Sequence, residues 1–288
     1  MTLVTADPAT FQGKGVARRL MSRPPTAIGC IVALTIIVVA IAAPIVAPYA
    51  PAANDFDAIL SPPTFAHPMG TDELGRDTLS RAIWGARASM LAGILATLLA
   101  VVVAVPIGLI SGFYRGRIDG LTMRATDAML AFPFLIVAVL LTAILGPSLQ
   151  NAALAIGLVQ IPKLIRITRG EVLGLREESF VQAAIADGAP DRSVIFRHIL
   201  PNTLNVLLVQ ATVVLPFAIL AEATLSFLGL GVQPPTPSWG VMLTAAQPYL
   251  GTAPWLAIAP GMAILLTTLS FNLVGDGLRD VLDPRLDR

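Results

Sequence analysis

The chain contains 288 residues, of which 55% are apolar and only 13% are charged. Soluble globular domains carry about 25% charged residues, so the composition argues against a soluble protein and favours a chain embedded in membrane lipid. The net charge of +1 gives no clustered basic surface for nucleic acid. The single cysteine, Cys30, excludes an intramolecular disulfide, and two histidines are too few for a His/Cys metal site.

Charged residues divide the chain into apolar stretches that match the length of membrane-spanning helices, about 20 residues. The dipeptide Gly146-Pro147 favours a turn inside one stretch, and the proline-rich segment 229–254 cannot be one continuous helix. The sequence therefore predicts an all-α integral membrane protein. Its six transmembrane helices are expected at about residues 27–47, 88–111, 128–145, 149–168, 203–228 and 254–274.

The distribution of Lys and Arg predicts the orientation of these helices, because basic residues near the ends of spans tend to stay in the cytoplasm. With both termini in the cytoplasm, 16 of the 19 basic residues lie in inner segments, and only Arg76, Arg81 and Arg87 lie outside. A cleaved signal peptide is an alternative for the first span, but its apolar core exceeds the roughly 7 to 15 residues of a signal sequence. The chain then divides into three parts, namely a cytoplasmic N-terminal segment (1–26), a first span with its outer loop (27–87) and a core with five spans (88–288).

The second half of the outer loop, residues 71–87, places apolar and charged residues on different faces of a helix. Thr71 can cap this helix, and acidic residues in the first turn oppose the helix dipole. We therefore predict an amphipathic helix that either receives a partner protein or only packs on the membrane domain. Its partner-facing charges would be Asp72, Glu73, Arg76 and Asp77.

The inner segment between the fourth and fifth spans, about residues 170–197, reads as two short helices joined by a turn. Ser179 and Gln182 have the spacing of a capping box, and Gly188 suits the left-handed position that ends a helix. Ala183 and Ala184 make this helix slim, so that it can approach another surface closely. A second helix would begin at Asp191 and end at Pro201. The segment is either a docking element or an ordinary connection.

Glu222 is the only acidic residue well inside a predicted span, where burial of a carboxylate is costly. It either contacts the cationic end of a substrate or forms hydrogen bonds that tie two helices together. The glycine-rich turn that follows needs polar support, which favours the structural role. Gly108 and Gly112 form a G-x-x-x-G pattern, which is typical of close helix packing.

Several motifs resemble those of ABC importer permeases. The residues Gln182-Ala183-Ala184, Gly188 and Leu200-Pro201 resemble the EAA loop of that family, with Gln182 where the pattern has Glu and His198 where it has Ile. Three further stretches resemble the C-type permease subunit of dipeptide, oligopeptide and nickel importers. They are HPMGTDELGRD at 67–77, LSFLGLGVQPP at 225–235, and GDGLRD with LDP at 275–284.

The resemblance implies the fold of a type I ABC importer permease, a multi-pass protein of the bacterial cytoplasmic (inner) membrane. It implies as partners a homologous B-type permease, two ABC ATPase subunits and an extracytoplasmic substrate-binding protein. The loop that couples to the ATPases would contain Ser179, Gln182, Ala183, Ala184, Gly188, Leu200 and Pro201.

Energy is expected to come from another chain, because the P-loop pattern G-x-x-x-x-G-K-[ST] is absent from the sequence. We therefore expect no catalytic residue, no metal and no cofactor in this chain, with ATP and Mg bound by the partner ATPases. The resemblance favours peptides as substrate and leaves nickel or another small solute as alternatives. A secondary transporter would show internal repeats or several intramembrane ionisable groups. A purely structural membrane subunit would not need the slim inner helix.

Overall fold

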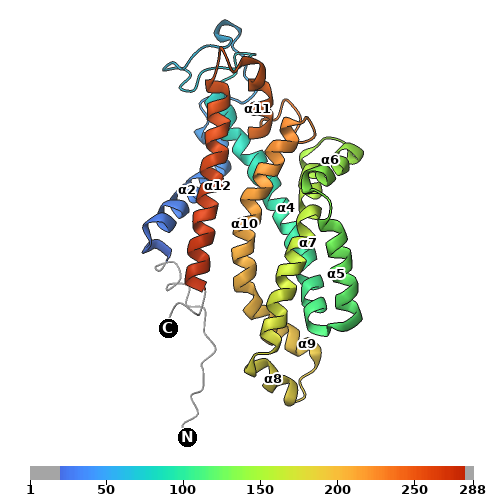
Figure 1. Ribbon diagram of the computed structural model, residues 1–288. Coiled ribbons are helices and arrows are strands. Elements are labelled where there is room, and N and C mark those ends of the chain that lie inside the picture. Colours follow the sequence, from blue (N-terminus) through green and yellow to red (C-terminus); the bar gives the residue numbers. More distant parts are fainter. Residues whose placement is uncertain (1–19, 283–288) are drawn as a thin grey trace.

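The computed structural model describes residues 20–282 of the chain, which form an elongated bundle of helices (Figure 1). Expectations for residues 1–19 and 283–288 lie outside the described residues. The long helices are α2 (Pro24–Ile41), α4 (Thr78–Tyr114), α7 (Leu149–Arg176), α10 (Leu200–Phe227) and α12 (Trp255–Leu282). The shorter elements are α3 (Ala43–Val46), η1 (Phe56–Ala58), α5 (Gly116–Leu130), α6 (Phe134–Leu145), α8 (Ser179–Ala186), α9 (Asp191–Ser193), the π-helix η2 (Val194–Ile199), α11 (Trp239–Ala246) and η3 (Gln247–Tyr249).

Within residues 20–282, four helices are long and apolar enough to cross a membrane, or five if α5 and α6 form one bent span. They are α2, α4, the continuous helix that runs from Asp191 to the end of α10, and α12. The all-α membrane architecture is thus confirmed. The helix α7, predicted as a span at 149–168, falls outside this set, and it carries Lys163 and Arg166 in its middle. It nevertheless packs along α4, next to α10.

The helices α4 and α7 run in parallel and approach closely at small residues. A β carbon added at Gly108 would lie 2.6 Å from Cβ of Thr168, and one added at Gly112 would lie 2.8 Å from Cβ of Val172. Gly157 of α7 meets α4 in the same way, at 2.9 Å from the carbonyl oxygen of residue 96. The predicted packing role of Gly108 and Gly112 is therefore confirmed.

The helix predicted over residues 71–87 is confirmed only from Thr78 onward, where it is the first part of α4, and residues 71–77 are not helical. Thr71 and Asp77 instead form an antiparallel bridge that closes a turn, and Gly75 in this turn has a φ of +72°, a conformation outside the helical region. The helix begins at Thr78, where the Asp77 carboxylate accepts a hydrogen bond of 2.7 Å from the amide of Ser80. It continues without interruption through the predicted second span, so one helix replaces the two that were expected.

The third predicted span, residues 128–145, is also not one helix. The helices α5 and α6 are bent by 85° at the break between Leu130 and Phe134. Pro133 explains the break, because proline has no N–H to donate and disfavours helical geometry in the residue before it.

The second inner helix does not end at Pro201 as predicted. Pro201 lies in the first turn of α10, and the helix continues from Asp191 to Phe227 through the π-helix η2. A proline inside a helix clashes with the carbonyl group four residues earlier, and the wider turns of a π-helix accommodate it. The side chains of Asn202 and Thr203 donate to the carbonyl groups of residues 198 and 199, at 2.6 and 2.9 Å, and so satisfy backbone groups at this point.

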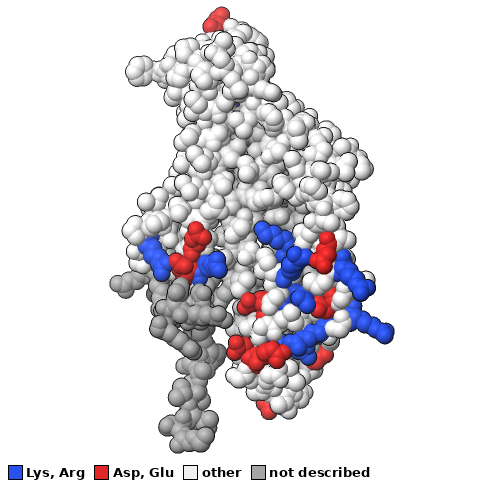
Figure 2. All heavy atoms as spheres, viewed as in Figure 1, with Lys and Arg blue, Asp and Glu red and all other residues white. Residues whose placement is uncertain are grey.

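Charged residues gather toward the end of the bundle that carries α8, and a broad uncharged belt lies between them and the end that carries α11 (Figure 2). Arg23 before α2 pairs with Asp280 near the end of α12. Asp119 of α5 pairs with Arg169 of α7 at 2.5 Å. An uncharged belt between polar ends is the surface that a bilayer requires.

Candidate functional site

The predicted coupling helix exists as α8 and is attached to the bundle by one buried side chain. Val181 is fully buried in an apolar cluster with Phe113 of α4, Val172 of α7 and Leu207 of α10. On either side of it, Phe180 is 42% exposed and Ile185 is 39% exposed. The helix therefore presents an exposed surface while it remains packed against the ends of three long helices.

The C-terminus of α8 forms as predicted. Gly188 has a φ of +79°, its amide donates to the carbonyl group of Ile185 at 3.0 Å, and the amide of Ala189 donates to that of Ala184 at 3.1 Å. This pair of bonds is the Schellman motif, in which a glycine in the left-handed conformation ends the helix. A β carbon at Gly188 would meet nothing within 4 Å, so the backbone conformation alone favours glycine here.

The predicted capping box is wrong. The N-cap of α8 is Glu178, whose side chain makes no capping hydrogen bond, and Ser179 is the first helical residue. The Gln182 amide instead donates to the carbonyl group of Arg176 at 2.7 Å, and so ties α8 to the end of α7. Because the helix begins at Ser179, Gln182 lies one position too far along it to reach the N-cap amide.

The remaining residues of the predicted coupling set lie in two places. Ala183 is exposed on α8 and Ala184 is partly buried. Leu200 packs against the apolar cluster that holds Val181, whereas Pro201 is exposed at the start of α10. The predicted coupling residues therefore lie partly on the exposed helix α8 and partly in the hydrophobic cluster to which this helix is attached.

Glu222 is fully buried at the centre of a polar network between helices. Its carboxylate accepts hydrogen bonds from the hydroxyl groups of Ser89 of α4, at 3.0 Å, and Ser226 of α10, at 2.6 Å. These hydroxyl groups in turn accept from backbone amides, of Trp239 at 3.3 Å and of Val232 at 3.0 Å. The carboxylate thereby connects α4 and α10 to α11 and to the loop that precedes it.

The serines that donate hydrogen bonds to Glu222 were not predicted from the sequence. Ser89 lies 133 residues before Glu222, so no local pattern indicates their contact. Ser226 could have been found, because a residue four positions later lies on the same face of a helix.

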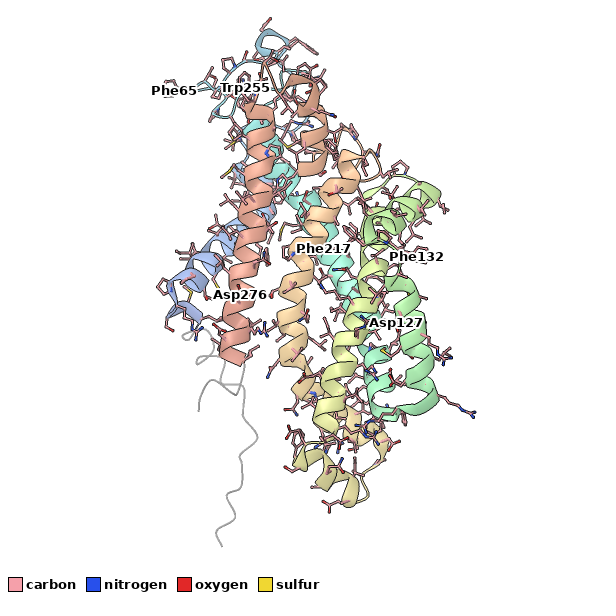
Figure 3. All side chains as sticks on the ribbon, in the orientation of Figure 1. Phe65, Asp127, Phe132, Phe217, Trp255 and Asp276 are labelled. Carbon is pink, nitrogen blue, oxygen red and sulfur yellow. The ribbon has the colours of Figure 1, made fainter. Side chains whose placement is uncertain are left out.

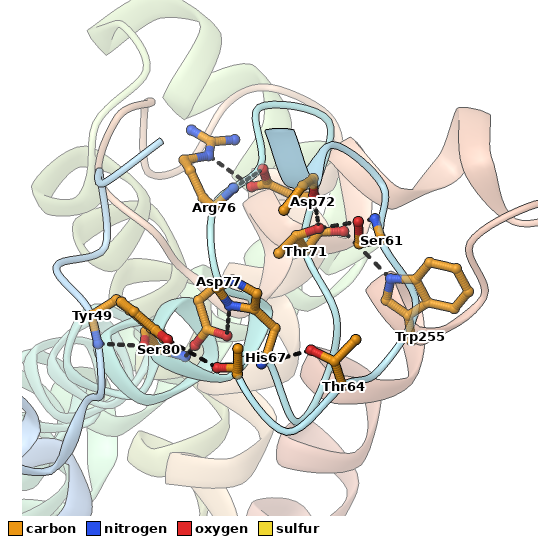
Figure 4. Close-up of polar contacts among 12 residues, drawn as sticks. Tyr49, Ser61, Thr64, His67, Thr71, Asp72, Arg76, Asp77, Ser80 and Trp255 are labelled. Carbon is orange, nitrogen blue, oxygen red and sulfur yellow. Dashed lines mark hydrogen bonds and ion pairs between the residues drawn. The ribbon is translucent and has the colours of Figure 1, made fainter. Parts of the chain in front are cut away.

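The four charges of the predicted outer helix instead hold the turn between Thr71 and Asp77 together (Figure 4). The Asp72 carboxylate accepts from the amides of Leu74 and Arg76, at 2.9 and 3.0 Å, and from the Arg76 guanidinium at 2.7 Å. The same guanidinium donates to Glu73 at 2.8 Å. Asp72, Arg76 and Asp77 are buried, so these side chains point into the turn instead of projecting from a helix.

The loop next to this turn is held by His67. Its Nδ1 atom lies 3.0 Å from the carboxylate of Asp77, and its ring lies 5.0 Å from the ring of Tyr49 (Figure 4). The Tyr49 hydroxyl group donates to the carbonyl group of Ala66 at 3.1 Å. His198 lies on η2, which contacts α8, and α8 is at the opposite end of the bundle from α11 (Figure 1). Between residues 20 and 282, no three His, Cys, Asp or Glu side chains come together as metal ligands.

Two family models match the chain. The binding-protein-dependent transport system inner membrane component matches residues 104–288, and the N-terminal TM domain of oligopeptide transport permease C matches residues 12–63. These two segments include α2, the predicted coupling helix α8 and Glu222.

Curated relatives are similar over almost the whole chain. The dipeptide transport system permease protein DppC of Alkalihalophilus pseudofirmus is 44% identical over 90% of this chain and 85% of its own length. The di/tripeptide transport system permease protein DppC of Pseudomonas aeruginosa is 45% identical over 90% of this chain and 87% of its own length. The probable D,D-dipeptide transport system permease protein DdpC of Escherichia coli is 42% identical over 96% of this chain and 92% of its own length.

The apolar helices and these matches define a multi-pass membrane permease of the bacterial inner membrane. The chain belongs to the family of binding-protein-dependent transport system inner membrane components. Within this family, its N-terminal part matches the oligopeptide transport permease C subunits.

Proposed function

We propose that this chain is the C-type permease subunit of an ATP-driven ABC importer and forms half of the translocation pathway for dipeptides or oligopeptides. The observation that carries the proposal is the attachment of α8. Val181 is buried among side chains of α4, α7 and α10, while neighbouring positions of α8 are exposed. A subunit docked on the exposed side can move these long helices as a unit. The names of the relatives, which are transport proteins for dipeptides and tripeptides, support peptides as the substrate class.

The proposal includes six spans, with α7 as the fourth and the bent pair α5 and α6 as the third. The basic residues of α7 lie toward α8, where Arg166 pairs with Asp127 and Arg169 pairs with Asp119. Both termini and α8 then lie in the cytoplasm, and the turn at Thr71 lies outside. This arrangement supports the division into segments 1–26, 27–87 and 88–288.

The partners follow from the same proposal. A homologous B-type permease completes the pathway, two ABC ATPases contact α8, and an extracytoplasmic binding protein delivers the peptide. This chain is non-catalytic and carries no cofactor, since ATP and Mg bind to the ATPases. The pattern G-x-x-x-x-G-K-[ST], which a P-loop requires, is absent from the sequence.

The test is transport by the reconstituted complex of both permeases, both ATPases and the binding protein. We expect uptake of a labelled dipeptide that requires ATP and the binding protein. Uptake of nickel in the absence of peptide would show that nickel, and not a peptide, is the substrate. Uptake driven by an ion gradient without ATP would indicate a secondary transporter. The control is the same complex with an ATPase that cannot hydrolyse ATP, which should bind peptide through the binding protein but transport none.

A further inference from the structure

The bend between α5 and α6 places interrupted backbone on the surface of this chain. The helices are bent by 85°, with Ala131, Phe132 and Pro133 between them. The end of one helix leaves carbonyl groups, and the start of the next leaves N–H groups, without partners inside the helix. At this bend the Pro133 carbonyl group accepts from the amides of Ile136 and Val137, so the interrupted backbone consists of the last carbonyl groups of α5 and the first N–H groups of α6. All three residues of the bend are exposed, and Phe132 is 64% exposed.

The depth of the bend follows from contacts between neighbouring helices. The ring of Phe134, at the start of α6, lies 4.9 Å from that of Phe217 in α10. Phe217 is five residues, or about 7.5 Å, beyond Thr212, which packs against Gly275 of α12. Gly275 lies 20 residues, or about 30 Å, along α12 from its first residue, Trp255. Phe217 is about 7.5 Å closer to Trp255 than the contact at Gly275 is, so it lies about 22 Å from that end of α12. The bend is therefore inside the apolar part of the bundle.

Figure 3 supports this placement, because Phe132 and Phe217 both lie farther from α8 than Asp127 and Asp276 do. A bilayer cannot accept lipid-exposed interrupted backbone at this depth. Such backbone is tolerated only where other protein covers it or where it lines a water-filled cavity.

A charged pair on the same elements favours water. Asp127 lies one helical turn before the bend and pairs with Arg166 of α7, and the two side chains are 63% and 53% exposed. This pair belongs to the charged end of the bundle, which water reaches. Because Asp127 and Ala131 are four residues apart at the end of α5, they lie on the same face of the helix, and the exposed bend therefore adjoins a surface that is in contact with water.

We propose that the bend of residues 131–133 lines the peptide passage between this chain and the second permease, and that the Phe132 ring narrows this passage. The proposal rests on the proposed function. A peptide carries the same backbone N–H and carbonyl groups that the two helix ends at the bend present, so the two can exchange hydrogen bonds whatever the peptide side chains are. The Phe132 ring supplies an apolar obstacle beside these polar groups.

The test is the reactivity of introduced cysteines toward a charged, membrane-impermeant thiol reagent, in the assembled complex with Cys30→Ala as background. The probe is Phe132→Cys and the control is Ile31→Cys. Gly29 of α2 packs against residues 270–274 of α12, so Ile31 lies at nearly the same depth as Phe217. Ile31 is 56% exposed, on the unbroken helix α2.

We expect Phe132→Cys to react at least about tenfold faster than Ile31→Cys, because only the former would face water. Equal rates would overturn the proposal, as would a Phe132→Cys that does not react. If Phe132→Cys does not assemble, Ala131→Cys takes its place, since it removes no aromatic ring. ATP-dependent peptide uptake by the unsubstituted complex is measured in the same vesicles. Intact uptake with an unreactive bend refutes this inference alone, whereas lost uptake refutes the proposed function.

The narrowing by Phe132 has its own measurement. Vesicles loaded with a labelled dipeptide should release it without ATP severalfold faster when they contain Phe132→Ala than when they contain Ile31→Ala. Equal release from both would show that the Phe132 ring does not close the passage.

Discussion

The carboxylate of Glu222 accepts a hydrogen bond of 3.0 Å from the hydroxyl group of Ser89, a residue that lies 133 positions earlier in the chain. The same hydroxyl group accepts from the amide of Trp239, at the start of α11. Ser226 repeats the arrangement between the second carboxylate oxygen and the amide of Val232. Each serine hydroxyl group therefore links Glu222 to a backbone amide, because it donates its hydrogen to the carboxylate and accepts from the amide with its oxygen.

Substitution of Glu222 should weaken the complex in a defined order. Glu222→Leu removes the acceptor for the hydroxyl groups of Ser89, Ser226 and Ser238, at about 1–3 kcal/mol for each group left unpaired. Glu222→Gln keeps one acceptor and places an amide donor opposite the other serine, so its effect should be intermediate. The measurement is the fraction of complex that remains assembled after heating in detergent.

The control is a double-mutant cycle with Ser89→Ala, which removes the hydroxyl group that donates to Glu222 but also leaves the Trp239 amide without its acceptor. The double variant Ser89→Ala with Glu222→Gln should therefore lose less stability than the sum of the two single variants. Normal assembly of Glu222→Leu, combined with lost peptide uptake in Glu222→Gln, would instead assign Glu222 to the substrate.

The apolar stretches of the sequence predict the positions of most helices, because a bilayer demands long uncharged segments whatever their neighbours are. The turn before α4 could not be predicted in this way. Residues 71–87 have helical periodicity, but the Asp72 carboxylate accepts two backbone amides and Gly75 adopts a positive φ, which together favour a turn. The bend at Pro133 is indicated in the sequence, but counting charges alone overlooks it.

The features of the candidate site could likewise be predicted from the sequence only in part. Gly188 could be predicted, because few residues other than glycine tolerate its conformation. The capping box could not be placed correctly, since a shift of one residue in the start of α8 gives Gln182 a different partner. The contact between Ser89 and Glu222 depends on the packing of α4 against α10, which no local pattern contains.

The end of α8 should depend on the backbone conformation of residue 188. Gly188→Asn should retain coupled transport, because asparagine tolerates the left-handed region, whereas Gly188→Val should lose it. Since a β carbon at residue 188 would meet nothing within 4 Å, a clash with neighbouring residues cannot explain the difference. The measurement is ATP-dependent peptide uptake at equal amounts of permease in the membrane. Equal uptake by both variants would show that the turn at Gly188 does not position α8.

Substitutions of two neighbouring residues of α8 should distinguish its attachment to the helix bundle from its docking on the ATPases. Val181→Ala opens a cavity in the buried cluster and should destabilise the packing of α8 by about 2 kcal/mol. Phe180→Ala truncates a side chain that is 42% exposed, so it should leave thermal stability unchanged and reduce retention of the ATPases. Thermal unfolding and co-purification of the ATPases give the two readouts. The reverse pattern would contradict the proposed docking surface.

The orientation of the chain can be tested with cysteines in a Cys30→Ala background. A membrane-impermeant reagent applied to whole cells should label Asn54→Cys, in the loop after α3, and leave Ser179→Cys unlabelled until the cells are opened. The charge distribution explains the difference, because basic segments stay in the cytoplasm. Labelling of Ser179→Cys in intact cells would reverse the orientation and remove the contact between α8 and the ATPases.

The contact between α4 and α7 should tolerate no β carbon at Gly108. In Gly108→Ala this atom would lie 2.6 Å from Cβ of Thr168 and 3.0 Å from the carbonyl oxygen of residue 165, so the two helices must separate. We expect a loss of about 1–3 kcal/mol, typical of overpacking. The control is Gly174→Ala in α7, where a β carbon meets nothing within 4 Å and should add up to about 1 kcal/mol of helix stability. Thermal unfolding of the purified complex decides between them. Equal stability of the two variants would mean that α4 and α7 do not depend on this close approach.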